Sequence, residues 1–185
     1  MIIDGKKEAE IIESEIKKEI SDLKTKIKKI PSLTVILIGD YVPSQIYVKN
    51  KEKIINAIHP SKDVDGFNPV NVGNLSSGYK SIVPCTPLGC LLLIKKVEPD
   101  LSGKHAVIIG RSNLNGKPMA QLLLKENCTV TVVHSKTNSL QNECLKADIL
   151  VAAAGVPNLV KRDWVKEDVI AVSYTHLTLP TICSV

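Results

Sequence analysis

The segment Gly-Arg-Ser-Asn-Leu-Asn-Gly-Lys-Pro at positions 110–118 constrains the fold more than any other part of the chain. An apolar run, His105–Ile109, precedes it and is typical of a buried strand, while residues 119–125 follow with the composition of a helix. A strand, a glycine turn and a helix start form an anion site, because backbone N–H groups converge there and the helix dipole favours negative charge. The segment therefore predicts a phosphate-binding turn in an α/β unit.

Strand-like and helix-like segments alternate from Leu101 onward. The predicted order is a strand at His105–Ile109, a helix at Pro118–Glu126, a strand at Thr129–Val133, a helix at Leu140–Lys146 and a strand at Ile149–Ala153. Alternation at this spacing predicts βαβ units and a parallel sheet. The fold class expected for this part of the chain is therefore α/β, with a Rossmann-like parallel sheet.

The first hundred residues are organised differently. Isoleucine and leucine recur every three or four residues between Lys6 and Ile30, which predicts a long amphipathic helix that ends before Pro31. A strand at Leu33–Ile38 and a second helix from about Pro43 to Ile58 follow. Residues 63–88 are rich in glycine and proline and are expected to be irregular, before a helix at Gly89–Lys96. A boundary between two α/β domains is expected near residue 95.

Composition excludes several classes of protein. The net charge is +5, but most lysines stand among acids as on a solvated helix face, so nucleic-acid binding is not expected. The five cysteines form no CxxC pair and the four histidines are scattered, so we predict a reduced cytoplasmic protein without a metal site. No apolar run reaches the roughly 18 residues of a membrane span.

The glycine turn has its own pattern, G-x-S-x-x-x-G-x-P, formed by Gly110, Ser112, Gly116 and Pro118. The turn is longer than the common dinucleotide fingerprint, and a serine hydroxyl joins the backbone donors. Proline suits the first turn of the helix that follows. From the glycines alone, a plain turn with a helix cap explains the segment equally well.

The end of the next strand favours one cofactor over another. Where a cofactor carries a free ribose 2′-hydroxyl, an acid usually follows this strand. Here Ser135 and Lys136 follow instead, and with Arg111 they suit a 2′-phosphate, which favours NADP over NAD. The alternative is that these polar residues only cap the sheet edge. Gly155, after the third strand, would let the backbone approach a ribose or nicotinamide, or simply form a tight turn.

A second group of polar residues lies earlier in the chain. Tyr47 and Lys51 are four residues apart on the second predicted helix and share one face, with Ser44 nearby. A phenol beside an ammonium can shift either pKa and so assist proton transfer. Asp65 stands in a loop from which a carboxylate can hydrogen-bond a heterocycle. The alternatives are a solvated helix face and an Asx turn.

Four ordered motifs carry a family resemblance. They are Ser44-x-x-Tyr-x-x-x-Lys51, the run Lys-Asp-Val-Asp-Gly-Phe at 62–67, Pro-Cys-Thr-Pro-Leu-Gly at 84–89, and the turn at 110–118. Together they resemble the bifunctional methylenetetrahydrofolate dehydrogenase/methenyltetrahydrofolate cyclohydrolase family of the bacterial FolD type. The resemblance implies two α/β domains with a folate cleft between them. It also implies NADP-dependent oxidation of 5,10-methylenetetrahydrofolate, then hydrolysis of the methenyl product to 10-formyltetrahydrofolate.

The resemblance also implies roles for individual residues. Lys51 resembles the catalytic lysine of the hydrolytic step, Tyr47 would orient the folate and support Lys51, and Asp65 resembles the acid that binds the pterin ring, with Ser44 beside the substrate. The residues implied to bind the cofactor are Gly110, Arg111, Ser112, Gly116, Ser135 and Gly155. Tetrahydrofolate derivatives are the implied ligands, and intact members of the family commonly form homodimers.

The chain departs from the family pattern at two places. Only residues 52–62 separate Lys51 from the aspartate loop, so strand and helix elements expected there, together with a glutamine that assists the lysine, are missing, with the junction near 55–56. Residues 173–185 match no family element, and their start, Ser-Tyr-Thr-His-Leu, is the translation of a transposase adapter end. A genuine divergent C-terminus is the alternative.

These departures set the expected organisation and activity. We expect a partial folate-binding domain at 1–95, a partial NADP-binding domain at 96–172 and a foreign tail at 173–185. Weak NADP binding, low solubility and negligible cyclohydrolase turnover are predicted, because missing strands expose sheet edges and apolar surface. A non-catalytic nucleotide-binding module and a different NADP oxidoreductase, such as a shikimate-type dehydrogenase, remain the alternative functions.

Overall fold

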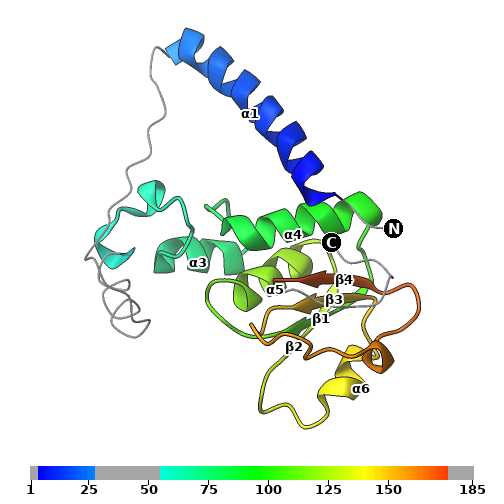
Figure 1. Ribbon diagram of the computed structural model, residues 1–185. Helices are drawn as coiled ribbons and strands as arrows, with labels where there is room; N and C mark the ends of the chain where they lie inside the picture. Colours follow the sequence, from blue (N-terminus) through cyan, green and yellow to red (C-terminus); the bar gives the residue numbers. More distant parts are fainter. Residues whose placement is uncertain (1–3, 28–54, 175–185) are drawn as a thin grey trace, which may run out of the picture. The chain divides into compact units, whose positions relative to one another are not determined.

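The computed structural model of the chain describes residues 4–27 and 55–174. It divides into two compact units, one formed by residues 4–50 and the other by residues 51–185 with residues 1–3. The predicted strand at Leu33–Ile38 and most of the predicted helix from Pro43 lie outside the described residues. Figure 1 labels the helix of the first unit and the helices and strands of the second.

The described part of the first unit is one helix, α1 (Gly5–Ile27). Asp4 begins it, because its carboxylate accepts hydrogen bonds from the backbone N–H groups of Lys6 and Lys7 at 3.1 and 3.2 Å. This is the side-chain capping that satisfies the free donors of a helix start. The helix predicted from the isoleucine spacing is therefore present, and its predicted last turn, residues 28–30, lies outside the described residues.

The second unit is built on a parallel sheet of four strands. The strands are β1 (His105–Ile109), β2 (Thr129–Val133), β3 (Ile149–Ala152) and β4 (Ile170–Ser173), in the order β2-β1-β3-β4. Every neighbouring pair is parallel. The prediction of a parallel α/β sheet is confirmed, and the bounds predicted for the first two strands agree with the structure.

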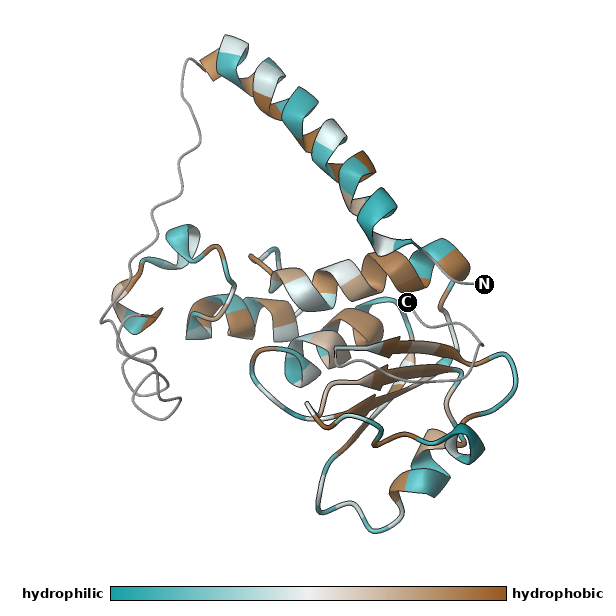
Figure 2. Cartoon of the chain, in the orientation of Figure 1, coloured by the Kyte–Doolittle hydropathy of each residue, from teal (hydrophilic) through white to brown (hydrophobic). Residues whose placement is uncertain are grey.

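Helices cover both faces of this sheet. Helices α4 (Cys85–Val97) and α5 (Gly116–Lys125) lie on one face, and α6 (Leu140–Cys144) lies on the other with the short turn η2 (Arg162–Trp164) (Figure 1). Successive strand side chains point to opposite faces. Ala106 and Ile108 accordingly belong to the core under α4 and α5, whereas Val107 and Ile109 belong to the core under α6. Figure 2 shows the strands as the most continuously hydrophobic part of the fold.

The segment expected to be irregular contains a helix that the sequence analysis missed, α3 (Pro69–Ser76), after a 3₁₀ turn, η1 (Pro60–Lys62). Asn68 caps α3, since its side-chain oxygen accepts the N–H of Val70 at 3.0 Å. Pro69 occupies the first helical position, where no N–H is needed. The glycine and proline content of the segment hid this start signal.

Helix α4 begins four residues before its predicted start at Gly89. Pro84 is its N-cap residue and Pro87 lies in its first turn. Backbone N–H groups in a first turn have no partner within the helix, so proline costs little there. Pro84 and Pro87, which predict irregular chain from the sequence, therefore belong to the start of a helix.

One residue, Asp148, connects the amino ends of three strands. The Asp148 carboxylate accepts hydrogen bonds from the His105 backbone N–H at 2.8 Å and from the Lys166 ammonium at 2.7 Å. The Asp148 backbone carbonyl accepts the N–H of Ile170 at 2.9 Å. The two bonds to the carboxylate lower the pKa of the Asp148 carboxyl, the bond from the Lys166 ammonium contributing most. The amino edge is therefore held by hydrogen bonds of Asp148, whose carboxylate also pairs with Lys166.

Candidate functional site

The carboxyl ends of three strands coincide at one edge of the sheet. Ile109, at the end of β1, is in register with Val133 of β2 and with Ala152 of β3. The loops that begin at residues 110, 134 and 153 therefore leave the sheet side by side. This edge is where open parallel sheets bind their ligands, because the loops and helix N-termini meet there.

Two glycines bring the first loop into backbone contact with its neighbours. Gly110 has φ of 121°, a conformation that favours glycine, and its N–H donates to the Val133 carbonyl at 2.8 Å. A Cβ on Gly110 would lie 2.6 Å from the carbonyl oxygen of Ala153. A Cβ on Gly116 would collide with the carbonyl oxygen of Gly110. The start of α5 is thereby packed directly against the end of β1.

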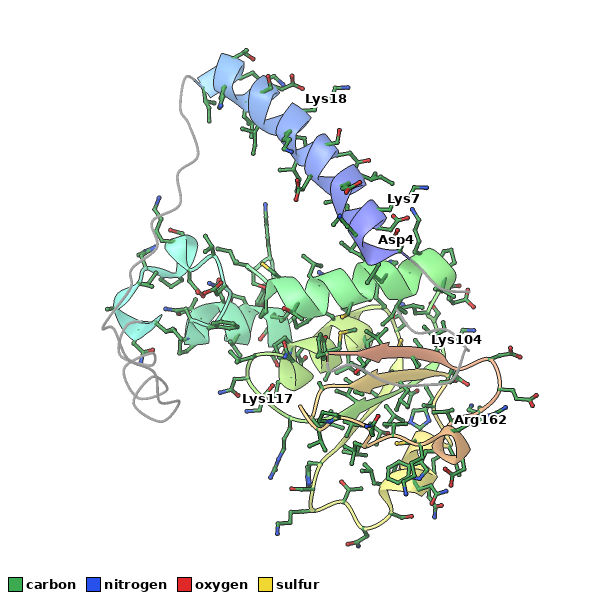
Figure 3. The ribbon with its side chains drawn as sticks, viewed as in Figure 1. Asp4, Lys7, Lys18, Lys104, Lys117 and Arg162 are labelled. Carbon is green, nitrogen blue, oxygen red and sulfur yellow. The ribbon has the colours of Figure 1, made fainter. Side chains whose placement is uncertain are left out.

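Hydrogen bonds within the loop preserve this arrangement. The Ser112 hydroxyl oxygen accepts the Asn115 N–H at 3.1 Å, and the Ser112 carbonyl accepts the Lys117 N–H at 3.0 Å. The Lys117 ammonium donates to the Asn113 side chain at 2.7 Å. Figure 3 shows Lys117 at the end of the sheet away from Lys104, which precedes β1. The turn is therefore stabilised by hydrogen bonds within the loop itself.

The polar residues predicted to select the cofactor are all exposed at this edge. Arg111 follows Gly110, Ser135 lies in the loop after β2, and Gly155, with φ of 70°, lies in the loop after β3. The loop after β2 is closed by Thr137, whose hydroxyl accepts the N–H of His134 at 2.9 Å. The predicted cofactor residues thus share one edge and reach it from three separate loops.

The two aspartates of the Asp-Val-Asp loop have different environments. Asp63 is 5 % exposed, and its carboxylate accepts the Asn68 N–H at 2.7 Å and the Asn71 side-chain amide at 2.9 Å. Asp65 is exposed. Asp63 therefore has a structural role in shaping the loop, and Asp65 is the carboxylate left open to a ligand. The family resemblance had already selected Asp65 as the candidate ligand, whereas the burial of Asp63 had no signal in the sequence.

The loop that carries Asp65 is fixed at a second point. Gly66 has φ of 71°, and a Cβ there would lie 2.6 Å from the Ile82 carbonyl oxygen. The loop therefore packs against the chain that leads into α4. The other residues predicted for the folate side, Ser44, Tyr47 and Lys51, lie outside the described residues.

Two hollows of the described structure lie elsewhere. One, of about 370 Å³, is at the amino edge of the sheet and is lined by Glu98, Lys104, Asp148 and Lys166 among others. The other, of about 490 Å³, is lined by residues 56–60 and 68–70. Neither includes the glycine turn. Among the described residues, no group of three His, Cys, Asp or Glu side chains suits a metal ion, and no helix is long and apolar enough to cross a membrane.

The chain matches two models of one family. The model described as "Tetrahydrofolate dehydrogenase/cyclohydrolase, NAD(P)-binding domain" matches residues 84–176, and that for the catalytic domain of the same family matches residues 3–55. Together with the parallel sheet and the glycine turn, these matches define an NAD(P)-binding α/β protein. The chain belongs to the tetrahydrofolate dehydrogenase/cyclohydrolase family.

Its relatives include named bacterial sequences and solved structures. The bifunctional protein FolD of Pelagibacter ubique is 52 % identical over 225 residues, which cover 93 % of this chain and 80 % of the relative. That of Rhodospirillum rubrum is 39 % identical over 236 residues, which cover 97 % of this chain and 80 % of the relative. Both alignments are longer than the 185-residue chain, so the relatives contain residues within the aligned region that have no counterpart here.

Two solved structures share the fold. The Trypanosoma brucei methylenetetrahydrofolate dehydrogenase-cyclohydrolase, complexed with NADP cofactor and inhibitor, is 29 % identical with a TM-score of 0.79, and the match covers 93 % of this chain and 77 % of that one. The bifunctional enzyme FolD of Campylobacter jejuni is 51 % identical with a TM-score of 0.64. That match covers 66 % of this chain and 44 % of the Campylobacter chain.

Proposed function

We propose that the carboxyl edge of β1, β2 and β3 binds NADP. We further propose that the chain derives from an enzyme that oxidises 5,10-methylenetetrahydrofolate to the methenyl form and hydrolyses this to 10-formyltetrahydrofolate. The observation that carries the proposal is the backbone contact of Gly116 with Gly110 at the point where three strand ends meet. It creates a cradle without side chains at a helix start, the environment that a pyrophosphate requires.

The residues at this edge fit the cofactor. Arg111 and Ser135 are exposed on neighbouring loops and supply a guanidinium and a hydroxyl for a 2′-phosphate. Gly155 lets the backbone of the third loop approach the ribose or nicotinamide. When bound, NADP accepts the hydride that leaves the folate. The task of the protein in this step is to position two ligands, since the neighbouring folate nitrogen takes up the positive charge.

The folate side is proposed on fewer structural grounds. Asp65 would bind the pterin through its exposed carboxylate, held by the buried Asp63 network. Lys51 would act in the hydrolytic step with support from Tyr47, and Ser44 would lie beside the substrate. A lysine and a tyrosine one helical turn apart can shift each other's pKa, and such a shift can assist proton transfer.

The proposed domain organisation limits what this chain catalyses. We propose a partial catalytic domain at 1–95 interrupted near 55–56, a partial NADP-binding domain at 96–172 and a foreign tail at 173–185. The catalytic-domain match ends at residue 55, beside the proposed junction. NADP binding is therefore the activity expected to persist, with negligible cyclohydrolase turnover. Codons for residues 173–177 that differ from the adapter string would remove the foreign-tail assignment.

The cofactor assignment is tested by titrating the purified chain with NADP and with NAD by calorimetry. Arg111→Ala is expected to raise the Kd for NADP about tenfold and to leave that for NAD nearly unchanged, because only NADP carries the extra phosphate. Arg162→Ala is the matched control, since Arg162 is also exposed and belongs to η2 on another part of the domain (Figure 3). Equal loss of both cofactors in Arg111→Ala would contradict the assignment.

A different NADP oxidoreductase is the competing function. Tetrahydrofolate is expected to raise the Tm of the wild-type chain, and Asp65→Asn is expected to reduce this shift, because the amide lacks the charge that pairs with pterin donors. Asp65 is exposed, so the substitution is not expected to perturb the fold. The absence of any shift with tetrahydrofolate would leave the NADP site in place but would remove folate as the second ligand.

Location and assembly complete the proposal. We propose a cytoplasmic protein that binds no nucleic acid, on the basis of its reduced-cysteine pattern and mixed charge. Intact relatives are proposed to form homodimers.

A further inference from the structure

The loop that follows β2 begins with a four-residue turn, residues 134–137, that is closed by its last residue. The hydroxyl oxygen of Thr137 accepts the backbone N–H of His134 at 2.9 Å. The backbone N–H of Thr137 in turn donates to the carbonyl of His134 at 2.8 Å. Both backbone groups of the first residue after the strand are therefore bonded to one threonine. This reciprocal pairing fixes the direction in which the chain leaves β2.

The turn is anchored at its base as well. The carbonyl of Val133, the last residue of β2, accepts the N–H of Gly110 at 2.8 Å, so the turn starts at a point that is joined to the glycine turn. Val133 is buried and His134 is half-buried. The two middle residues of the turn, Ser135 and Lys136, are exposed. A fixed base therefore carries an exposed tip.

The bonding within the turn leaves Ser135 with unused donors. The N–H of Lys136 donates to Nδ1 of His134 at 3.2 Å, and the N–H groups of His134 and Thr137 are bonded to each other's residue. Neither the N–H nor the hydroxyl of Ser135 has a hydrogen-bond partner in the described part of the chain. Two donors on one exposed residue suit the oxygens of a phosphate, which form strong charge-assisted hydrogen bonds.

Arg111 and Ser135 place different demands on the backbone. A guanidinium on a long side chain can meet a phosphate from several backbone positions. The serine hydroxyl is attached directly to Cβ, so a displacement of the turn by about 1 Å takes it out of hydrogen-bond range. The contribution of Ser135 therefore depends on closure of the turn, whereas that of Arg111 does not. Threonine suits the closing position, because its β-branched side chain has few χ1 rotamers.

We propose that Thr137 is a positioning residue for cofactor selectivity, which closes the turn so that Ser135 meets the 2′-phosphate of NADP. The inference rests on the proposed cofactor site and adds to it a residue that acts through another. A turn that is closed beforehand avoids the cost of ordering the loop when the ligand binds. NAD has no phosphate at this position, so closure of the turn favours NADP over NAD.

Calorimetric titration of the full chain with NADP and with NAD tests the proposal. Thr137→Val keeps the shape of the side chain and removes the hydroxyl, and it is expected to raise the Kd for NADP about five- to tenfold with little change for NAD. Thr137→Ser retains the acceptor and is expected to stay within about twofold of the wild type. Thr129→Val is the matched control, since Thr129 is exposed at the opposite end of β2.

A double-mutant cycle shows whether Thr137 acts through Ser135. Thr137→Val added to Ser135→Ala is expected to cost less NADP affinity than Thr137→Val alone, because the hydroxyl that it misplaces is already absent. Thr137→Val added to Arg111→Ala is expected to cost the full factor. The two backgrounds differ only in which phosphate ligand has been removed, so they separate a local effect from a general one.

Three results would overturn the proposal. The first is an unchanged Kd for NADP in Thr137→Val, and the second is an equal loss of both cofactors, which indicates a general structural role. The third is a full loss in the Ser135→Ala background. Equal Kd values of the wild type for NADP and NAD would be a separate outcome, because they would refute the 2′-phosphate assignment and, with it, the basis of this inference.

Discussion

At Gly116 the fold leaves no space for a side chain. A Cβ at this position would collide with the carbonyl group of Gly110. Because this carbonyl belongs to the backbone, the collision could be relieved only by a shift of β1 or α5. Gly89, in the middle of α4, has no atom within 4 Å of the same hypothetical Cβ. The two helical glycines therefore differ in their surroundings and not in their secondary structure.

This contrast predicts opposite effects of one substitution. Gly116→Ala is expected to lower the free energy of unfolding by about 2–4 kcal/mol and to abolish NADP binding, because the turn must open. Gly89→Ala is expected to raise it by about 0.5–1 kcal/mol through reduced backbone entropy of the unfolded chain. Urea unfolding of both variants measures this. Equal stability of the two variants would show that the close approach at Gly116 is absent.

Cys144 provides a second prediction at the scale of a residue. It is fully buried in the core under α6, and burial raises the pKa of its thiol to about 11 from 9.0. The unfolded state therefore loses this proton first as the pH rises. The stability contribution is complete below pH 9 and is lost as the pH rises to about 11.

The measurement is the pH dependence of unfolding in the wild type and in Cys144→Ala. The wild type is expected to lose stability more steeply between pH 9 and pH 11, by on the order of 2 kcal/mol in total. All other groups are the same in both proteins, so their contributions cancel in the comparison. Parallel pH profiles would show that the thiol does not have the raised pKa.

At the scale of the element, the sheet is fastened differently at its two edges. The amino edge is held by the Asp148 carboxylate, which bonds the start of β1 and pairs with Lys166. The carboxyl edge is held by backbone contacts of Gly110 and by hydrogen bonds within its loop. Charged groups therefore stabilise the amino edge, which is away from the proposed cofactor site. Among the described residues, the carboxyl edge is stabilised without such ion pairs, so its polar groups stay accessible to a ligand.

Asp148→Asn is expected to lower the free energy of unfolding by about 1 kcal/mol near neutral pH, through loss of the charge-assisted bond to Lys166. The pKa of this carboxyl is lowered in the folded state, so its contribution is present above the unfolded value of 3.8 and is lost as the pH falls through the folded pKa. Acid unfolding of wild type and variant should therefore converge at low pH. A constant difference down to the lowest pH would contradict this sign.

At the scale of the whole molecule, the cofactor half is better defined than the folate half. Residues 84–174 form a sheet covered by helices on both faces, whereas residues 55–83 contain α3, η1 and the loop that carries Asp65 and contribute no strand. Strands β2 and β4 are the edges of the described sheet. Edge strands and uncovered apolar surface favour association, which underlies the expected low solubility.

Restoring the missing segment tests this view of the whole chain. Insertion of the corresponding residues of the Pelagibacter relative between Ile55 and Asn56 is expected to increase solubility and to yield measurable cyclohydrolase turnover. Lys51→Ala in the restored chain is the control and is expected to lose turnover while retaining NADP binding. Turnover in the unmodified 185-residue chain that depends on Lys51 would contradict the proposed loss of activity.

The sequence by itself determined the parallel sheet and the place of the cofactor turn. The bounds predicted for His105–Ile109 and Thr129–Val133 agree with the structure, because buried parallel strands are continuous apolar runs. The glycines of the turn could also be predicted from the sequence, because positions that need a positive φ or a close backbone approach are usually glycine. The same holds for α1, whose isoleucine spacing records one helical face.

Only the tertiary structure showed that Asp63 is buried while Asp65 is exposed, and that α3 is present. It also decided that Gly116 touches Gly110, and that loops after β1, β2 and β3 meet at one edge. Each of these depends on contacts between segments distant in sequence, or on which of two similar residues is buried. A local pattern carries no information on either point, because burial and close approach are properties of the packed chain.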